Sequence, residues 1–296
     1  MRHVVGSMLV LAVACGGGHE NPPPFDGQMA LRYVEQQLAF GPRVPNTEGH
    51  RRTGDWILAK LQERADSVEV QTFTHVTTTG DTLALRNFVG KFRPAAVERI
   101  LYMAHWDTRP QADRSPNLGQ QQLPVPGAND GASGVALLLA VADALSDTPP
   151  SFGVDLVFVD GEDYGDFTSR DDVLIGSTHY ADQLTPDRFP LFAIVWDMVG
   201  DRDLQLHQEG YSVQRAPEVV DRVWSRAADL GHGRVFRPTV AYTMLDDHVP
   251  LLDAGVRAID VIDFDYPPWH TTEDTLDKVS AESLQIVGEV AVALVR

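Results

Sequence analysis

The stretch VDLVFVDGED, residues 154–163, joins a run of mostly apolar residues to three carboxylates, Asp160, Glu162 and Asp163. A short, nearly continuous apolar run is typical of a strand that is covered on both faces, as in a parallel sheet flanked by helices. In open sheets of this kind, ligands bind beyond the carboxyl ends of the strands. The stretch therefore predicts a buried strand that leads directly into a ligand site rich in negative charge.

Three further apolar runs have the same form: ILYMA at 100–104, LFAIVW at 191–196 and VRAIDVI at 256–262. Segments with helical spacing, such as 131–147 and 217–231, lie between the runs. Because strands and helices alternate along the chain, we expect an α/β fold. Its architecture should be a single-domain three-layer sandwich, in which a mostly parallel mixed central sheet is flanked by helices.

The segments before these runs have other patterns. Apolar residues recur at helical spacing from Gln28 to about Arg64 and predict two helices joined by a structured loop. Residues 68–92 are rich in β-branched residues around a Gly-Asp turn, which predicts a hairpin or neighbouring strands. The proline-rich segment 108–128 is long for a structureless connection, so we expect it to form a rim element.

The amino terminus has the layout of an export signal. A basic start is followed by an apolar run from Val4 to Ala14, too short to cross a bilayer, and by Ala-Val-Ala-Cys, which resembles a bacterial lipoprotein signal. We expect residues 1–15 to be a signal peptide with cleavage before a lipidated Cys15, 16–27 a flexible tether, and 28–296 one catalytic domain. Simple secretion and an uncleaved anchor are the alternatives.

The chain is strongly acidic, with a formal net charge of −18 at pH 7. Such a charge repels phosphate backbones and anionic lipid, so we expect no nucleic-acid partner and contact with a membrane only through a lipid anchor. The natural counterparts are cations. Cys15 is the only cysteine, so no internal disulfide can form. We expect an exported monomer, anchored on the periplasmic or cell-surface side or otherwise secreted.

Potential metal ligands follow the apolar runs. They are His105 and Asp107 after the first, Asp160, Glu162 and Asp163 after the second, Asp197 after the third and His270 soon after the last, with Asp130 at the start of a helix-like segment. A single aspartate at a strand end is more often a cap or turn former than a ligand. Several carboxylates and two imidazoles converging on one edge would repel one another unless a cation joined them. The set therefore predicts a metal site, and histidine with carboxylates suits zinc, with manganese or cobalt as substitutes.

Adjacent side chains in an extended segment point in opposite directions. Glu162 and Asp163 can therefore divide the work, one binding metal and the other serving as a base. A desolvated carboxyl near other carboxylates has its pKa raised toward neutrality, as such a base requires.

Taken together, the motifs resemble the zinc aminopeptidase superfamily, whose members hold one or two zinc ions at the edge of a mixed α/β sheet. The motifs are HWD at 105–107, GANDGASG at 127–134, DGED at 160–163, WD at 196–197 and WHTTEDTLD at 269–277. Within the superfamily the chain is more similar to glutaminyl cyclases, also called glutaminyl-peptide cyclotransferases. The features that favour them are FGPRVPN at 40–46, LDDHVPLL at 245–252 and the tryptophan directly before His270.

The resemblance implies a role for each matching residue. Zinc would be bound by Asp130, Asp163 and His270. Glu162 would be the acid/base and would form a hydrogen-bonded carboxylate group with Asp246 and Asp197, while Trp269 would line the substrate pocket. A second metal would be bound, or the first supported, by His105, Asp197 and Asp107. We expect one zinc ion, with two as the alternative. The superfamily also implies a cis peptide bond between Asp130 and Gly131.

Three departures from the animal cyclases concern the fit of the substrate. Asp163 stands where those enzymes have glutamate, Phe167 and Thr168 stand where they have a tryptophan, and their disulfide cannot form here. The implied activity is conversion of amino-terminal glutamine of peptides or proteins to pyroglutamate. A zinc-dependent aminopeptidase is the alternative, and a binding module without catalysis is a third reading, disfavoured because the base and every ligand are present.

Overall fold

The computed structural model describes residues 25–296, so the predicted signal and Cys15 lie outside the described residues. The folded domain begins earlier than the predicted boundary at 28. Phe25 is buried in the main core, and the Asp26 side chain caps the first helix by accepting a hydrogen bond from the Met29 amide. Residues 25–27 therefore belong to the domain, because the tether prediction rested on composition and could not show what Phe25 contacts.

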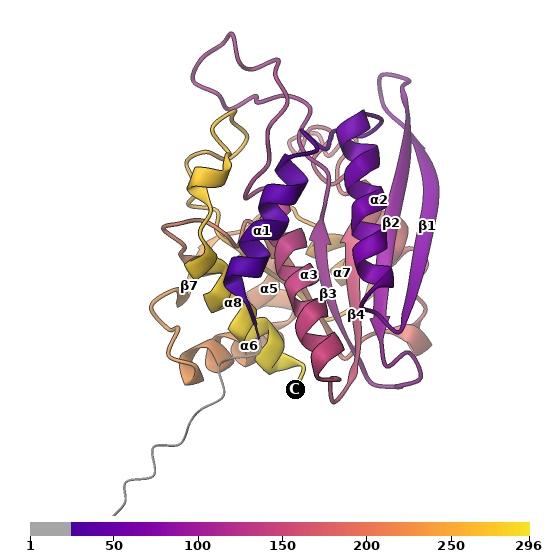
Figure 1. Cartoon of the computed structure of the whole chain (residues 1–296), viewed down its shortest axis with the longest axis vertical. Helices are drawn as coiled ribbons and strands as arrows, with labels where there is room; N and C mark the ends of the chain where they lie inside the picture. Colours follow the sequence, from indigo (N-terminus) through magenta and orange to yellow (C-terminus); the bar gives the residue numbers. More distant parts are fainter. Residues whose placement is uncertain (1–24) are drawn as a thin grey trace, which may run out of the picture.

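The centre of the molecule is a six-stranded sheet (Figure 1). Its strands, in spatial order, are β1 (Ser67–Val76), β2 (Thr82–Phe92), β4 (Gly153–Val159), β3 (Arg99–His105), β5 (Phe192–Asp197) and β8 (Ala258–Ile262). The four strands from β4 to β8 are parallel, while β1 and β2 form an antiparallel hairpin at one edge. The mostly parallel mixed sheet and the hairpin are confirmed.

Helices cover both faces of the sheet. One face packs against α1 (Gly27–Leu38), α2 (Glu48–Gln62), α3 (Ala132–Asp147), α6 (Pro217–Asp229) and α8 (Ala281–Leu294). The other packs against α4 (Ile175–Ala181), α5 (Gly210–Arg215) and α7 (His248–Ala254). None of the helices in the described part of the chain is both long and apolar enough to cross a membrane.

Strand β3 shows why the apolar runs are continuous. Ile100 and Tyr102 are buried in the core cluster on one face, whereas Leu101 and Met103 are buried in the cluster on the other. Because successive side chains of a strand point to opposite faces, a sheet covered on both sides needs apolar residues at every position. The predicted single domain with three layers follows from this pattern.

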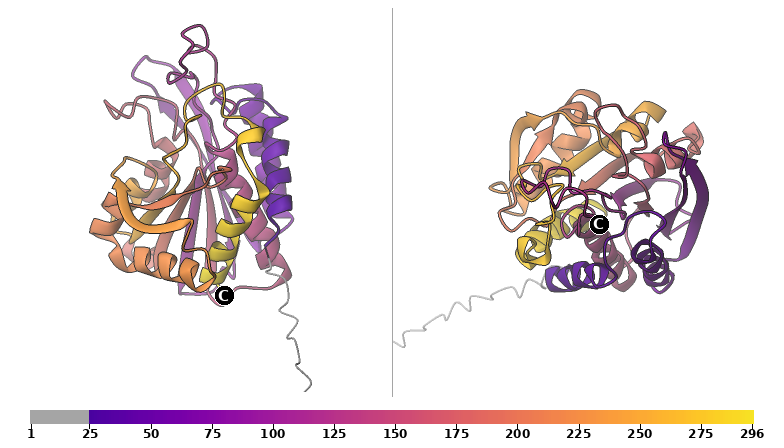
Figure 2. Two further views of the ribbon diagram at one scale, coloured as in Figure 1. Left: turned by 90° about the vertical axis from the view of Figure 1, so that its left-hand side faces the viewer. Right: turned by 90° about the horizontal axis from the view of Figure 1, so that it is seen from above.

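A small second sheet was not predicted. Strands β6 (Leu206–Glu209) and β7 (Phe236–Tyr242) pair in parallel beside β8, at the edge opposite the β1–β2 hairpin. Figure 2 shows this part in orange, away from the N-terminal helices in indigo. Most of β7 is exposed and it contains Pro238, so it has no continuous apolar run. Two short 3₁₀ turns, Pro186–Arg188 and Leu276–Lys278, complete the fold.

The segment between β3 and α3 forms the rim that the sequence suggested. It projects beyond the carboxyl ends of the strands in Figure 1 and folds back onto the segment that follows β8. The Arg114 amide donates to the His270 carbonyl at 3.1 Å, and the Ala128 amide donates to the Asp274 carbonyl at 3.2 Å. These bonds join two loops distant in sequence above one edge of the sheet.

Candidate active site

The residues to which the resemblance gave a role come together at the carboxyl edge of the sheet, whereas the Asp160 carboxylate is bonded to His50. His105 and Asp197 are the last residues of β3 and β5, and Asp130 lies just before α3. Glu162 and Asp163 follow β4 after Gly161, whose φ of 71° turns the chain. The pocket they share with residues from other loops has a volume of about 240 Å³. Its titratable lining residues are Asp130, Glu162, Asp163, Asp197, Asp246 and His270.

Asp107 supports the acidic pair through the backbone. Its carboxylate accepts hydrogen bonds from the amides of Glu162 at 3.0 Å and Asp163 at 3.2 Å. Asp107 is fully buried, and its Oδ1 also lies 3.5 Å from Nδ1 of His105. Of the two roles suggested for Asp107, these contacts favour support of the metal site over direct binding of a second metal.

Asp130 is held in place by Asp274, a residue that the sequence analysis did not single out. The Asp274 carboxylate accepts hydrogen bonds from the amides of Asn129 at 2.8 Å and Asp130 at 3.1 Å. It also accepts one from the Tyr266 hydroxyl at 2.7 Å. These bonds fix the backbone of the loop before α3, and the fixed backbone sets the direction in which the Asp130 side chain points.

The peptide bond between Asp130 and Gly131 is trans, so the predicted cis bond is wrong. The chain turns instead at Gly127, with φ 71°, and Gly131 already has the helical angles −66° and −10° at the start of α3. A trans peptide avoids the cost of about 3 kcal/mol for a cis bond without proline. Gly131 lies against His105: a Cβ there would be 2.7 Å from the His105 carbonyl oxygen.

Asp130, Asp163 and His270 form one group of potential metal ligands, with one donor atom from each lying within 4.8 Å of the others. Nε2 of His270 is 3.3 Å from Oδ1 of Asp163 and 3.8 Å from Oδ2 of Asp130. Oδ2 of Asp163 is buried without a hydrogen-bond partner, which is costly for a carboxylate. Imidazole and carboxylate donors without a thiolate fit zinc. The group that the resemblance implied is thus assembled, with one orphaned oxygen that a cation would satisfy.

A second group shares Asp130 with the first and adds His105 and Asp197. Nε2 of His105 lies 3.2 Å from Oδ1 of Asp130 and 3.2 Å from Oδ1 of Asp197. Burial alone would lower the pKa of His105, but the charges of Glu162 and Asp197 outweigh it and hold the pKa well above its ordinary value. Burial raises the pKa of Asp197, against the opposing effect of His105. Asp130 therefore lies between two clusters, either of which could hold a cation.

Glu162 and Asp246 have the electrostatic surroundings of proton carriers. Burial raises the pKa of the Glu162 carboxyl well above its ordinary range, and the charges of Asp163 and Asp246 add to the shift. Burial and the charge of Asp197 raise the pKa of Asp246 in the same way. Glu162 therefore keeps its proton at a higher pH than a glutamate in water does.

A third cluster of Asp246, His248 and Asp260 lies deeper. Both oxygens of the Asp260 carboxyl are buried without a hydrogen-bond partner, and burial raises its pKa well above the ordinary value. Nε2 of His248 is 3.1 Å from Oε2 of Glu209. The Asp260 carboxyl therefore keeps its proton to a higher pH than a carboxyl in water does.

Aromatic and apolar side chains form the rest of the pocket wall. The Trp269 ring stacks on the His270 ring, with centroids 3.8 Å apart, and meets the edge of Phe264 at 4.8 Å. The apolar lining residues are Phe167, Met198, Met244, Leu245, Ile262, Phe264 and Trp269. Trp269 and Phe167 thus both lie in the wall of this pocket.

Sequence reasoning missed several partners of these residues. Asp274 and His248 lie within the motifs quoted above, and Asp260 is a charged residue inside an apolar run, so each had a signal. Arg109 and Asp113 had none, because they lie in an irregular loop without periodicity. Only the folded chain brings them against Asp163 and His270.

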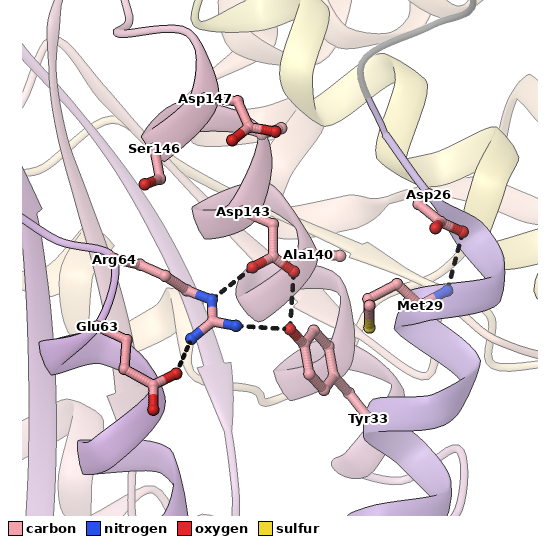
Figure 3. A pocket seen from close by; sticks show the side chains of 10 residues that line it. Asp26, Met29, Tyr33, Glu63, Arg64, Ala140, Asp143, Ser146 and Asp147 are labelled. Carbon is pink, nitrogen blue, oxygen red and sulfur yellow. Dashed lines mark hydrogen bonds and ion pairs between the residues drawn. The ribbon is translucent and has the colours of Figure 1, made fainter.

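A second crevice lies at the opposite end of α3 and has a larger volume, about 480 Å³ (Figure 3). Arg64 donates to Asp143 at 2.5 Å, to Glu63 at 2.8 Å and to the Tyr33 hydroxyl at 2.9 Å. The Tyr33 hydroxyl donates in turn to Asp143 at 2.7 Å. These polar groups satisfy one another, so the smaller pocket with unpaired carboxyls is the better candidate for chemistry.

The chain is similar to known cyclotransferases and aminopeptidases. Glutaminyl-peptide cyclotransferase of Bos taurus is 26% identical over 288 residues, covering 84% of this chain and 77% of that protein. Aminopeptidase YwaD of Bacillus subtilis (strain 168) is 25% identical over 297 residues, covering 91% of this chain but only 57% of YwaD.

Among solved structures, glutaminyl cyclase of Bacteroides thetaiotaomicron bound to N-acetylhistamine superposes with a TM-score of 0.88 at 34% identity. The match covers 93% of this chain and 99% of that one, so the two domains have the same extent. The model of the family described as "Peptidase family M28" matches residues 87–295, which include every predicted site residue of the folded domain. Because this match spans well over half of the sequence, the chain belongs to peptidase family M28.

Proposed function

We propose that this enzyme is a zinc-dependent glutaminyl-peptide cyclotransferase, an acyltransferase that converts amino-terminal glutamine of peptides or proteins to pyroglutamate and releases ammonia. The observation that carries the proposal is the position of Glu162, a buried carboxyl with a raised pKa, in a small pocket beside the Asp130, Asp163 and His270 group. The full-length match to a bacterial glutaminyl cyclase supports it.

Asp130, Asp163 and His270 would hold the zinc ion. When bound there, zinc supplies positive charge that polarises the oxygen of the substrate's side-chain amide. The sharing of Asp130 between two ligand groups leaves room for a second ion. We propose one ion, since the cyclisation needs no metal-activated water, and a metal analysis of the purified protein would count the ions.

Glu162 moves the proton in the reaction. The substrate's α-amino nitrogen attacks the side-chain amide carbon, a C–N bond forms, and the bond to the departing nitrogen breaks. The Glu162 carboxylate accepts a proton from the attacking amine and delivers it to the departing nitrogen, so ammonia leaves and Glu162 is restored. General acid–base catalysis of this kind contributes about 10²- to 10⁴-fold. Asp246 and Asp197, whose own pKa values are raised, would keep this proton close to Glu162.

The pocket wall orients the glutamine side chain. Because the nucleophile belongs to the substrate itself, the protein mainly has to hold a reactive conformer and exclude water. Trp269, stacked on His270, and Phe264 offer an apolar surface for the methylene groups of glutamine. The alternative role for Trp269, packing a loop without touching substrate, predicts that its replacement alters stability and leaves KM unchanged.

An aminopeptidase is the second candidate, and the His105, Asp130 and Asp197 group favours it. The two adjacent ligand groups would hold two metal ions, which would supply Lewis acidity at the site, and Glu162 would be the base toward a water molecule. The similarity to YwaD supports this reading, although the chain spans little more than half of YwaD.

We also infer that the mature enzyme is exported and tethered to a membrane through lipid on Cys15, as a monomer with no nucleic-acid partner. The support is the signal-like sequence before Cys15 and the net charge of −18. Such a tether would place the site near exported proteins with amino-terminal glutamine. Radiolabelled fatty acid incorporated into the wild type and absent from Cys15→Ser would support the anchor, and absence of label from both would exclude it.

Mass spectrometry tests the activity directly. Residues 21–296, loaded with zinc, are incubated with a Gln-initiated peptide and with a Leu-initiated peptide. Loss of ammonia from the first peptide, with the second unchanged, is the expected result. Release of a free amino acid from either peptide would instead establish the aminopeptidase.

A further inference from the structure

Arg109 is a buried cation at the back of the candidate metal site. It is only 8% exposed, and its Nη1 donates to Oδ1 of Asp163 at 2.7 Å. Its Nε and Nη2 donate to the two oxygens of Asp113, each at 2.9 Å. A guanidinium fits two carboxylates in this forked manner, and a lysine could not reproduce both contacts.

Asp113 extends this contact to the histidine of the same group. Its Oδ1 lies 3.4 Å from Nδ1 of His270, while Nε2 of His270 faces Asp163 and Asp130. A histidine that binds metal through one nitrogen commonly donates its other N–H to a carboxylate, which fixes the tautomer and the ring orientation. One arginine therefore reaches one ligand directly and a second through Asp113.

The loop that carries Arg109 and Asp113 is tied to its neighbours. The Val125 amide donates to the Arg109 carbonyl at 3.1 Å, and the Arg114 amide donates to the His270 carbonyl at 3.1 Å. Because backbone bonds hold the loop at Arg109 and next to Asp113, the guanidinium has little freedom to leave Asp163. The arrangement is built into the fold and is not a chance surface ion pair.

The contact with Arg109 gives the two oxygens of Asp163 different surroundings. Arg109 occupies Oδ1, while Oδ2 is buried and has no partner. An aspartate that is held at one oxygen presents the other in a single direction.

We propose that Arg109 is a positioning residue that fixes Asp163, directly, and His270, through Asp113, as zinc ligands. This inference rests on the proposed zinc-dependent function. It concerns zinc affinity, however, and does not depend on whether the zinc enzyme is a cyclase or an aminopeptidase.

Zinc affinity measured by competition with a chromogenic chelator is the primary test. Arg109→Gln removes the charge and the fork, and loss of a contact of this kind weakens metal binding by about 10- to 100-fold. Arg109→Lys can restore the single contact to Asp163 and should recover part of the loss. The matched control is Arg114→Gln on the same loop, which removes a cation stacked over Trp269 at 5.2 Å and should change zinc affinity less than about 2-fold.

A double variant separates positioning from simple support of the loop. In Arg109→Gln combined with Asp163→Glu, the added methylene lets the carboxyl reach the zinc without being held at one oxygen. Zinc affinity should therefore rise above that of Arg109→Gln alone. A loop that has merely lost its ion pair would gain nothing from Asp163→Glu. Cobalt in place of zinc gives a second signature, because its visible absorption band should shift in Arg109→Gln and not in Arg114→Gln.

The outcomes are distinct. Zinc affinity of a folded Arg109→Gln within 2-fold of wild type, or no recovery in the double variant, would overturn the proposal. If Arg109→Gln fails to fold, the comparison of Arg109→Lys with Arg114→Gln decides in its place. A wild type that binds zinc and hydrolyses Leu-initiated peptides would refute the cyclase while leaving the role of Arg109 standing.

Discussion

Helix α3 has a carboxylate near each end, and the two have different surroundings. Asp143, in its C-terminal part, is paired with Arg64 and Tyr33 at the partly exposed crevice of Figure 3. Asp130, just before its first turn, is buried among His105, Asp163 and other titratable groups. In the first cluster, Arg64 and Tyr33 both donate hydrogen bonds to the Asp143 carboxylate. The other has more carboxyls than cations.

The difference teaches that buried carboxyls without hydrogen-bond partners, and not cavity size, identify the site. The crevice at Asp143 has about twice the volume of the pocket at Asp130, about 480 Å³ against 240 Å³, but its donors and acceptors are already satisfied. In the pocket, burial holds the pKa values of Glu162 and Asp246 high. Unpaired buried carboxyls must take up protons or bind a cation, and both are properties that catalysis can use.

The largest expected effect is on turnover. Glu162→Gln should lower kcat by about 10²- to 10⁴-fold, because the amide cannot accept the proton of the attacking amine. Thermal unfolding and zinc content should stay close to wild type. Glu63→Gln, at the cluster around Asp143, is the control and should retain full activity. Retention of a tenth of the activity by Glu162→Gln would remove this residue from the acid/base role.

Zinc should stabilise the protein by binding at the cluster around Asp130 and not at the cluster around Asp143. A ligand at 1,000 times its Kd stabilises the folded state by about 4 kcal/mol, so adding zinc to the metal-free protein should raise Tm by several degrees. Asp130→Asn should abolish this shift, because both ligand groups lose their shared member. Arg64→Gln should keep it. An equal shift in wild type and Asp130→Asn would place the zinc elsewhere.

Stability should also depend on pH at the carboxyl edge. Burial raises the pKa of Asp263, directly after β8, to about 7. The unfolded state then releases its proton at lower pH than the folded state, so stability is full below about pH 4 and falls as pH rises toward 7. The loss is at most about 1.4 kcal/mol per pH unit.

Asp263→Asn tests this pH dependence, because an amide cannot ionise and its oxygen can still accept from the Gln205 amide. Urea unfolding of the metal-free protein at pH 5 and pH 8 should show a smaller decline for the variant than for wild type. Parallel declines would mean that Asp263 ionises in the folded protein as readily as in the unfolded chain.

The smallest expected effect is a loss of stability at the cluster around Asp143. Asp143→Asn weakens the bonds to Arg64 and Tyr33, and a partly exposed pair of this kind contributes about 1 kcal/mol. Denaturant unfolding should show that loss while kcat and KM remain unchanged. A marked fall in kcat would show that the two ends of α3 are coupled and that the contrast drawn between them is incomplete.

Much of the fold could be predicted because burial leaves a periodic signal. Strand β3 is apolar at successive positions since both of its faces are covered, and α3 is apolar on nearly all sides since it lies at the centre of the core. Strand β7 is mostly exposed and contains a proline, so it gave no comparable pattern and was missed. The cis bond failed for another reason: it came from resemblance and not from the residues themselves.

The residues of the candidate site also differ in whether the sequence could predict them. His105, Asp130, Glu162, Asp163 and Asp197 could be found from the sequence because parallel strands end at one edge, so residues after successive strands must meet there. Arg109 and Asp113 could not, since their loop has neither periodicity nor a fixed offset from a strand. A contact between distant loops depends on how each one folds back over the sheet.

By itself, the sequence determined the class of fold, the edge at which the ligands gather and the kinds of donor atom present, since apolar periodicity and strand order carry that information. The tertiary structure decided which charges are paired. It left Oδ2 of Asp163 without a partner, gave Oδ1 to Arg109, and joined Asp143 to Arg64 at the far end of α3. The physical reason is that pairing depends on distances of about 3 Å between residues far apart in the chain, and only the folded backbone sets those distances.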